Sequence, residues 1–293
     1  MEINIDFCFL STGSQFKNLK GINFQYCESI TELPNLCAPN LEKLDLRYCR
    51  NLVEIHESIG FLDKLERWYL IYCEKLKTLP SNLMLKSLDV FDLEGCLSLE
   101  KFPNIHPEMK CLESLDLRRS GIRELPSSIE YLTSLTELHL NNCQNLRDLP
   151  DSIYKLQMLK KLWISTTKLR PVCNSFDSFS GYGVLRLEHL NLSDCENIIE
   201  LDFFMKPDYF PFLKYLDLSG TNVVTIPKSI SRFTKLKKLQ IYNCNQLREI
   251  PILPQSIRRV YAKNSPLLDP QSSSKLLIQV SLLILEKLCY LLK

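Results

Sequence analysis

The sequence predicts an α/β fold built as a solenoid, with a concave parallel β-sheet and a convex side of irregular or short helical segments. The first observation is a phrase, Leu-x-x-Leu-x-Leu-x-x-Cys-x-x-Leu, that recurs about every 23 to 24 residues along nearly the whole chain. The second is the alternation of leucine with polar residues, which is typical of a strand with one buried face. The third is that a single copy cannot bury its own apolar face, so the copies must stack.

Eleven copies of the phrase are legible, and each predicts one short strand. Leu44 and Leu46 illustrate the alternation, because Lys43, Asp45 and Arg47 flank and separate them. Strands about 4.8 Å apart would make a sheet on the order of 50 Å long. This period and pattern are those of leucine-rich repeats, which form a horseshoe. The copies begin at Leu19, Leu41, Leu65, Leu88, Leu112, Leu135, Leu159, Leu187, Leu213, Leu236 and Ile257.

The position that follows each strand holds cysteine in seven copies. A turn at this point favours a small, buried side chain with some hydrogen-bonding capacity. Three copies are one residue shorter and carry Ser120, Thr167 or Thr221 instead, whose hydroxyls can bond nearby backbone. We therefore expect a structural column of Cys27, Cys49, Cys73, Cys96, Cys143, Cys195 and Cys244, with these hydroxyl residues as polar substitutes.

The remainder of each copy reads Leu-x-x-Leu-Pro and then Ser-Ile-x-x-Leu, as at Leu125, Pro126 and Ile129. Because proline continues neither a ladder nor a helix interior, it predicts the crossing to the convex side, followed by a short helical turn. His56 occupies one proline position and is expected to be structural. The period is interrupted at Pro171 to Arg186 and at Asp202 to Phe212, where either partner-binding loops or neutral length drift would fit.

Composition indicates an ordinary soluble protein without a bias towards nucleic acid or membrane. The 293 residues are 45% hydrophobic and 24% charged, and 36 Lys and Arg against 34 Asp and Glu give a net charge of +2. Twelve cysteines, most of them one per repeat, favour reduced thiols in the cytosol over a disulfide framework. The first ten residues lack the basic region of a secretory signal.

Three segments are predicted. Residues 1–15 form a ragged start, a partial repeat or N-terminal edge, and residues 16–270 form the repeat domain. Residues 271–293 are an apolar tail. Its most apolar stretch, Leu276 to Leu292, is shorter than the roughly 20 residues that a membrane-spanning helix needs, and Gln279, Ser281, Glu286 and Lys287 interrupt it. A helix that caps the end of the solenoid is the leading interpretation, ahead of a disordered tail or membrane contact.

The strand side chains that point away from the core decide what the concave sheet binds. Aromatic residues mixed with cations have the composition of protein-interface hot spots. The opposing interpretation is that the rings simply pack over neighbouring strands. The candidate binding residues are Arg47, Arg67, Tyr69, Ile71, Arg118, His139, Lys161, Trp163, Tyr215 and Tyr242.

The pattern favours no chemistry beyond binding. Asp45, Asp92, Asp116 and Asp217 share one column, which we interpret as a solvated charge row. His139 has no Cys or Ser nearby that would make a catalytic pair, and no Cys-x-x-Cys pair suggests zinc. We therefore expect no catalytic residue, cofactor or metal, and a protein partner rather than nucleic acid or membrane.

The combined phrase, as in LHLNNCQNLRDLPDSIYKL, closely resembles the leucine-rich repeats of plant intracellular disease-resistance receptors over about Phe16 to Leu268. It is most similar to the class with an N-terminal TIR domain and a central nucleotide-binding domain. The resemblance implies a cytoplasmic or nucleo-cytoplasmic protein of the defence response. Its partners would be a pathogen effector or a guarded host protein, and the nucleotide-binding domain that it restrains. Because the chain shows no TIR segment and no phosphate-binding Gly-x-x-x-x-Gly-Lys-Ser/Thr loop, we expect a fragment of a larger receptor.

Two other functions remain open. A substrate-recognition adaptor of a ubiquitin ligase would carry an F-box-like segment upstream, which is not seen. The ectodomain of a receptor kinase would need a signal peptide, Gly-x-Ile-Pro repeats, cysteine caps and several glycosylation sequons. The chain has one sequon, Asn191-Leu192-Ser193, inside a predicted strand.

Overall fold

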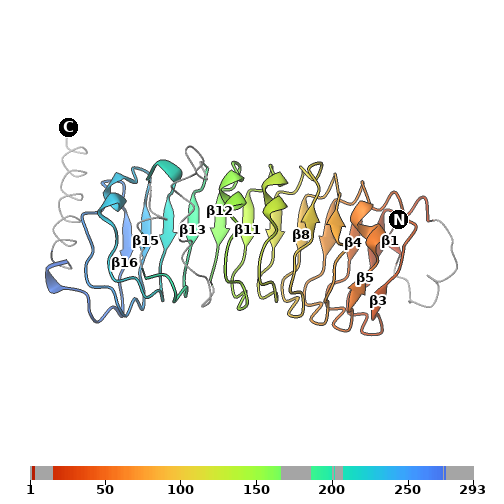
Figure 1. The fold of residues 1–293 in the computed structure, drawn as a ribbon, viewed down its shortest axis with the longest axis horizontal. Coiled ribbons are helices and arrows are strands. Elements are labelled where there is room, and N and C mark those ends of the chain that lie inside the picture. Colours follow the sequence, from red (N-terminus) through yellow and green to blue (C-terminus); the bar gives the residue numbers. More distant parts are fainter. Residues whose placement is uncertain are drawn as a thin grey trace. The chain divides into compact units, whose positions relative to one another are not determined.

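The computed structural model describes residues 2–3, 16–165, 186–199, 201, 207–272 and 274. They fall into two compact units, Met1–Ile164 and Ser165–Lys293. Within each unit, one short strand per repeat lies beside the next in a parallel sheet (Figure 1). The predicted fold class is confirmed, because each unit is a parallel-strand solenoid with little helix.

The long sheet of the first unit follows the chain order of the repeats. Its register aligns the buried central residues, so that Leu44 lies opposite Trp68 and Trp68 opposite Phe91. All three side chains are fully buried, and the Trp68 and Phe91 rings stack 4.7 Å apart. The strands, in sheet order, are β1 (Glu2–Ile3), β2 (Gly21–Asn23), β4 (Lys43–Asp45), β6 (Arg67–Tyr69), β8 (Val90–Asp92), β10 (Ser114–Asp116), β11 (Glu137–His139) and β12 (Lys161–Trp163).

The second unit repeats the same arrangement. Its strands are parallel, and Leu190, Leu216, Leu239 and Val260 align across the sheet. In both units, every copy of the phrase therefore contains one strand of the long sheet. The strands are β13 (His189–Asn191), β14 (Tyr215–Asp217), β15 (Lys238–Gln240) and β16 (Arg259–Tyr261).

Short 3₁₀ turns and small paired strands occupy the other side of the repeats. Three of the turns follow Pro126, Pro150 and Pro227, which confirms the predicted helical turn after proline. At the position without proline, His56 Nδ1 accepts the Ser58 backbone N–H at 3.1 Å, so this histidine caps the turn. The elements are β3 (Glu32–Leu33), β5 (Glu54–Ile55), β7 (Asn82–Leu83), β9 (Asn104–Ile105), η2 (Glu57–Phe61), η3 (Ser127–Tyr131), η4 (Asp151–Lys155), η6 (Pro207–Tyr209) and η7 (Lys228–Arg232).

The cysteine column joins each turn to the preceding one. In five of the seven, the thiol donates to a backbone carbonyl of the previous repeat, three residues before the position equivalent to the cysteine. Burial raises the pKa of Cys49 to about 12 and that of Cys143 to about 11. The sulfur to oxygen distances are 3.0 Å for Cys49 to Phe24, 3.2 Å for Cys73 to Leu46, 3.2 Å for Cys96 to Leu70, 3.0 Å for Cys143 to Leu117 and 3.2 Å for Cys244 to Leu218.

The hydroxyl residues take over this position where cysteine is absent. Ser120 is buried and its Oγ lies 3.6 Å from Cys143 Sγ, while Thr221 Oγ1 donates to the Leu218 carbonyl at 2.7 Å. The predicted bond from hydroxyl to backbone is confirmed at Thr221, while Ser120 is a buried polar residue at this position that contacts the next cysteine. Thr167 lies outside the described residues.

Several sequence predictions concern segments that the structure does not describe. They include residues 4–15, almost all of the Pro171 to Arg186 connection, half of the Asp202 to Phe212 connection and the tail from residue 275 onward. The bounds of the repeat domain stay a prediction. Within the described part of the chain, no helix has both the length and the apolar character needed to cross a bilayer.

We expect Gly121→Ala to destabilise the first unit by about 1 to 3 kcal/mol, because a Cβ atom here would overlap the Leu97 carbonyl oxygen of the preceding turn. Urea denaturation measures the free energy of unfolding. Gln144→Ala, on an exposed turn, is the control and should change it by less than about 0.5 kcal/mol. Equal stability of Gly121→Ala and the wild type would show that the turns are not packed this closely.

We expect maleimide labelling of the native chain at pH 8 to modify the exposed Cys111 quickly. Cys73 and Cys96 should react only after unfolding, because burial raises the pKa of both thiols and blocks access. Mass spectrometry with and without denaturant reads each site. Column cysteines recovered as linked pairs would contradict the reduced column and would support the extracellular alternative.

Candidate protein-binding surface

Each long-sheet strand places residues on both sides of its buried central residue, and these side chains form the open face of the unit. Six of the predicted binding residues lie on these strands, and Arg47, Ile71, Arg118 and Tyr242 lie two residues beyond a strand end. Eight of the ten are in the first unit and two in the second. Arg67 and Tyr215 are exposed, whereas Tyr69, Ile71 and Trp163 are only partly exposed. The predicted residues thus repeat at three positions, which are the first strand residue, the third strand residue and the second residue after the strand.

The aspartate column is not a solvated charge row, so that prediction was wrong. Asp45 is 0% exposed and Asp116 is 9% exposed. Each carboxylate accepts a hydrogen bond from the backbone N–H two residues later. This N–H lies at the strand end and has no partner in the sheet ladder. Asparagine accepts the same bond in other repeats. The Oδ1 to nitrogen distances are 3.0 Å for Asn23 to Gln25, 3.3 Å for Asp45 to Arg47, 3.1 Å for Asp92 to Glu94, 3.0 Å for Asp116 to Arg118, 2.8 Å for Asn191 to Ser193 and 2.9 Å for Asp217 to Ser219.

Two predicted cationic anchors are held by these carboxylates. Arg47 donates from its guanidinium to both oxygens of buried Asp45, at 2.9 and 2.6 Å. Arg118 donates to Asp116 at 2.8 Å and to Glu94 at 2.7 Å. Because their charges are compensated within the chain, these arginines present fixed planar donors rather than free positive charge.

Aromatic and charged side chains form a connected group at the end of the first unit. The His139 and Trp163 rings stack 4.0 Å apart, and Lys161 Nζ lies 5.6 Å from the Trp163 centroid. Lys161 also donates to Glu137 at 2.6 Å, a hydrogen bond that lowers the pKa of this carboxyl. Burial lowers the pKa of His139, which favours the neutral imidazole. The His139 and Trp163 rings therefore pack against each other across neighbouring strands, and both side chains stay partly exposed to solvent.

The remaining candidates differ in how firmly they are held. Arg47 also lies over the Tyr69 ring, 5.3 Å from its centroid. Arg67 is exposed and makes no ion pair within the described residues. In the second unit, the Tyr215 ring stacks on His189 at 4.2 Å and the Tyr242 ring tilts against Tyr261 at 5.6 Å.

A tyrosine row that sequence reasoning missed borders this face in the first unit. Tyr26 and Tyr48 stack with centroids 4.7 Å apart, and Tyr48 and Tyr72 with centroids 5.4 Å apart. All three have positive φ, 62°, 63° and 56°, a conformation that is costly for a bulky residue. The row ends at Gly95, where a Cβ would lie 2.6 Å from the Tyr72 ring. A tyrosine directly before cysteine in three successive copies was the sequence signal for it.

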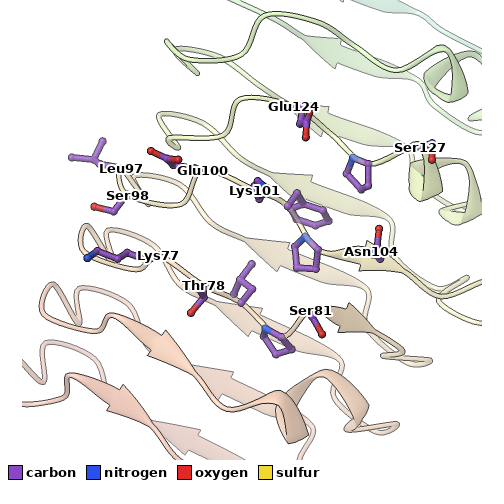
Figure 2. Close-up of a pocket in the computed structure, with 15 residues that line it drawn as sticks. Lys77, Thr78, Ser81, Leu97, Ser98, Glu100, Lys101, Asn104, Glu124 and Ser127 are labelled. Atoms are coloured by element: carbon purple, nitrogen blue, oxygen red, sulfur yellow. The ribbon is translucent and has the colours of Figure 1, made fainter.

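A separate groove of about 930 Å³ runs along segments that leave the long sheet of the first unit. Figure 2 shows its labelled side chains coming from successive turns, with Lys77 and Thr78 on one, Lys101 and Asn104 on the next, and Glu124 beyond them. None of the predicted binding residues lines it, and its lining includes no histidine or cysteine. Among the described residues, no group of three or more His, Cys, Asp or Glu is placed to hold a metal ion.

The comparisons with known proteins point to one family. A family model described as "Disease resistance protein RPS4B-like, leucine-rich repeats" matches residues 84–265, and a general leucine-rich repeat model matches residues 40–62. TMV resistance protein N of Nicotiana glutinosa is 32% identical over 291 residues, which cover 83% of this chain and 25% of that protein. Disease resistance protein RML1A of Arabidopsis thaliana is 34% identical over 189 residues, 64% of this chain and 18% of that protein.

The chain therefore spans a quarter or less of the length of these relatives. Among solved structures, the functional domain of InlJ from Listeria monocytogenes, described as including a cysteine ladder, is 14% identical. The match covers 81% of this chain and 64% of that one, with a TM-score of 0.41, and concerns the fold alone.

We expect Asp92→Asn to stabilise the chain above pH 6. Burial, with the Asp116 and Glu94 carboxylates nearby, raises the pKa of Asp92 to about 6 from an ordinary value near 3.8. The folded state thus binds the proton more tightly than the unfolded state, and the free energy of unfolding falls as pH rises between these two values. Asparagine keeps the acceptor for the Glu94 N–H and cannot ionise. The variant should gain roughly 1 to 3 kcal/mol at pH 7.5, and the gain should vanish near pH 4.

Urea denaturation at both pH values measures this difference. Asp92→Ala, which removes the acceptor as well as the charge, separates the two contributions and should gain less than Asp92→Asn at pH 7.5. A stability difference between Asp92→Asn and the wild type that did not change with pH would contradict the assignment.

Proposed function

Because this chain belongs to the leucine-rich repeat family of RPS4B-like plant disease-resistance proteins, we propose that it is the protein-recognition region of a plant intracellular immune receptor. Leucine-rich repeat domains generally bind proteins, and the repeat family and fold are recognition modules. The observation that supports the proposal best is the open face of the first unit. Aromatic rings, fixed arginines and the exposed Arg67 stand there on the strands of one sheet or two residues beyond a strand end.

The physical case rests on preorganisation. Trp163 is held by stacking on His139 and by the Lys161 ammonium, and Tyr69 is held by Arg47. Side chains that are already ordered lose little conformational entropy when a partner binds, so their buried area contributes more fully to affinity. Trp, Tyr and Arg are also the residue types in which binding energy concentrates at protein interfaces.

The relatives support the biological setting. In this proposal the chain recognises a pathogen effector or a guarded host protein, and it packs on the nucleotide-binding domain of its receptor to restrain it. It is not an enzyme, it acts in the cytoplasm or between cytoplasm and nucleus, and the other parts of the receptor supply signalling. We propose these partners because the relatives are disease-resistance proteins. The chain spans a quarter or less of the length of these relatives.

The test replaces Tyr69, Trp163 and Tyr242 together by alanine in the receptor that carries this region. We expect loss of effector-triggered cell death in leaves, or constitutive cell death if the restraining contact is lost, because hot-spot truncations typically cost about 2 kcal/mol or more each. Protein abundance on blots controls for folding. The matched control is alanine at Phe61, Tyr131 and Phe212, which are exposed aromatics outside the long-sheet strands. Unchanged recognition and unchanged restraint in the Tyr69, Trp163 and Tyr242 variant would refute the open-face proposal.

A further inference from the structure

Positive charge is concentrated in the second unit. Residues 207–272 contain ten Lys and Arg against four Asp and Glu, a formal charge of +6, in a chain whose total is +2. The repeats outside this stretch are therefore net acidic. A near-neutral chain that segregates its charges in this way carries a local field that can steer and orient a charged partner.

The cations gather on two adjacent strands, β15 and β16. Lys238 lies directly opposite Arg259 in the parallel register, and the Lys237 carbonyl accepts the backbone N–H groups of Arg258 and Arg259 at 2.8 and 3.0 Å. Lys237, Lys238, Arg258 and Arg259 thus form a block at strand spacing, with Lys263 just beyond β16. We call these five residues the basic patch.

Some of the equivalent positions in other repeats carry matched charges, although Lys43 lies opposite Arg67 in the first unit. One residue ahead of the strand, Lys20 pairs with Glu42 at 2.7 Å and Lys214 with Glu188 at 2.8 Å. At the first strand position, Lys161 pairs with Glu137 at 2.6 Å.

The basic patch differs from these three matched pairs. None of its five cations makes an ion pair within the part of the chain that the structure describes. Like charges directly across a strand pair destabilise a sheet, so the patch carries a cost in stability that the paired repeats avoid. Carboxylates supplied by a partner would remove that cost.

The aromatic side chains near the patch favour carboxylates over nucleic-acid bases. Lys238 Nζ lies over the Tyr261 ring at 5.3 Å, the Tyr242 ring tilts against Tyr261, and the Tyr215 ring stacks on His189. The ring faces are turned towards neighbouring strands, whereas binding of single-stranded nucleic acid uses free ring faces as stacking platforms. Guanidinium groups, in contrast, match the two oxygens of a carboxylate.

We propose that the basic patch binds an acidic protein segment, whose Asp and Glu side chains supply the carboxylates that these strand pairs lack. The proposal rests on the protein-binding function proposed above and gives the chemistry of one partner segment. The first-unit open face and the basic patch are separate sets of residues, so each can be tested without the other.

The test uses the full chain and a short fluorescent peptide of alternating Glu and Ser, followed by fluorescence anisotropy. We expect binding that weakens as salt increases and that the equivalent Gln and Ser peptide lacks. Lys238→Glu should weaken binding by roughly tenfold or more, because it reverses one charge and places a carboxylate opposite Arg259. The same variant should unfold at the same or a higher temperature than the wild type, since it replaces a like-charge pair by a matched one.

The control is Lys228→Glu on η7, which makes the same charge change in the same unit away from the long-sheet strands. It should alter peptide affinity by less than about twofold. Equal weakening by both variants, no binding of the Glu peptide, or tighter binding of a single-stranded oligonucleotide of equal formal charge would each overturn the proposal. Peptide binding retained when only Tyr69 and Trp163 of the first unit are replaced by alanine, together with intact receptor recognition, would refute only the open-face function.

Discussion

The structure depends on one constraint, which is that no repeat can bury the apolar face of its own strand. Leu44 is covered only because Trp68 lies beside it, and Trp68 only because Phe91 follows. The parallel register, the constant turn after each strand and the buried thiols all serve this stacking. The cysteine column shows the dependence most directly, since five of its thiols bond a carbonyl of the preceding turn, a partner that an isolated repeat lacks.

Stacking also determines what the open face can present. Once the leucines are aligned, every remaining strand residue stands beside its equivalent in the next repeat. The chemistry of each such pair then decides whether the contact is favourable. Glu137 and Lys161 become an ion pair, and His139 and Trp163 become a ring stack. Lys238 and Arg259 become an unmatched pair of cations by the same geometry. The surface is thus a set of rigid columns whose chemistry changes from repeat to repeat, a suitable basis for specific protein recognition.

Sequence reasoning located the surface but assigned some of its residues the wrong role. The aspartate column looked solvated because alternation places it on the polar side of the strand. In the structure, Asp45 is buried because it bonds the N–H that the strand end leaves open, and it then draws Arg47 onto itself. Similarly, the tyrosine before each of three cysteines could be read from the sequence, but its left-handed backbone and ring stacking could not.

The sequence by itself determined the fold class, the position of each strand and turn, and which columns face the core, because the period and the alternation are local properties of the chain. It also determined the family, since the repeat phrase carries that information. Only the tertiary structure decided which open-face residues form ion pairs or ring stacks with one another and which make no such contact. Those contacts join residues a full repeat or more apart, and their energy depends on burial and on neighbouring charge. Asp92 shows this, because its raised pKa comes from burial together with carboxylates that include one on the next strand.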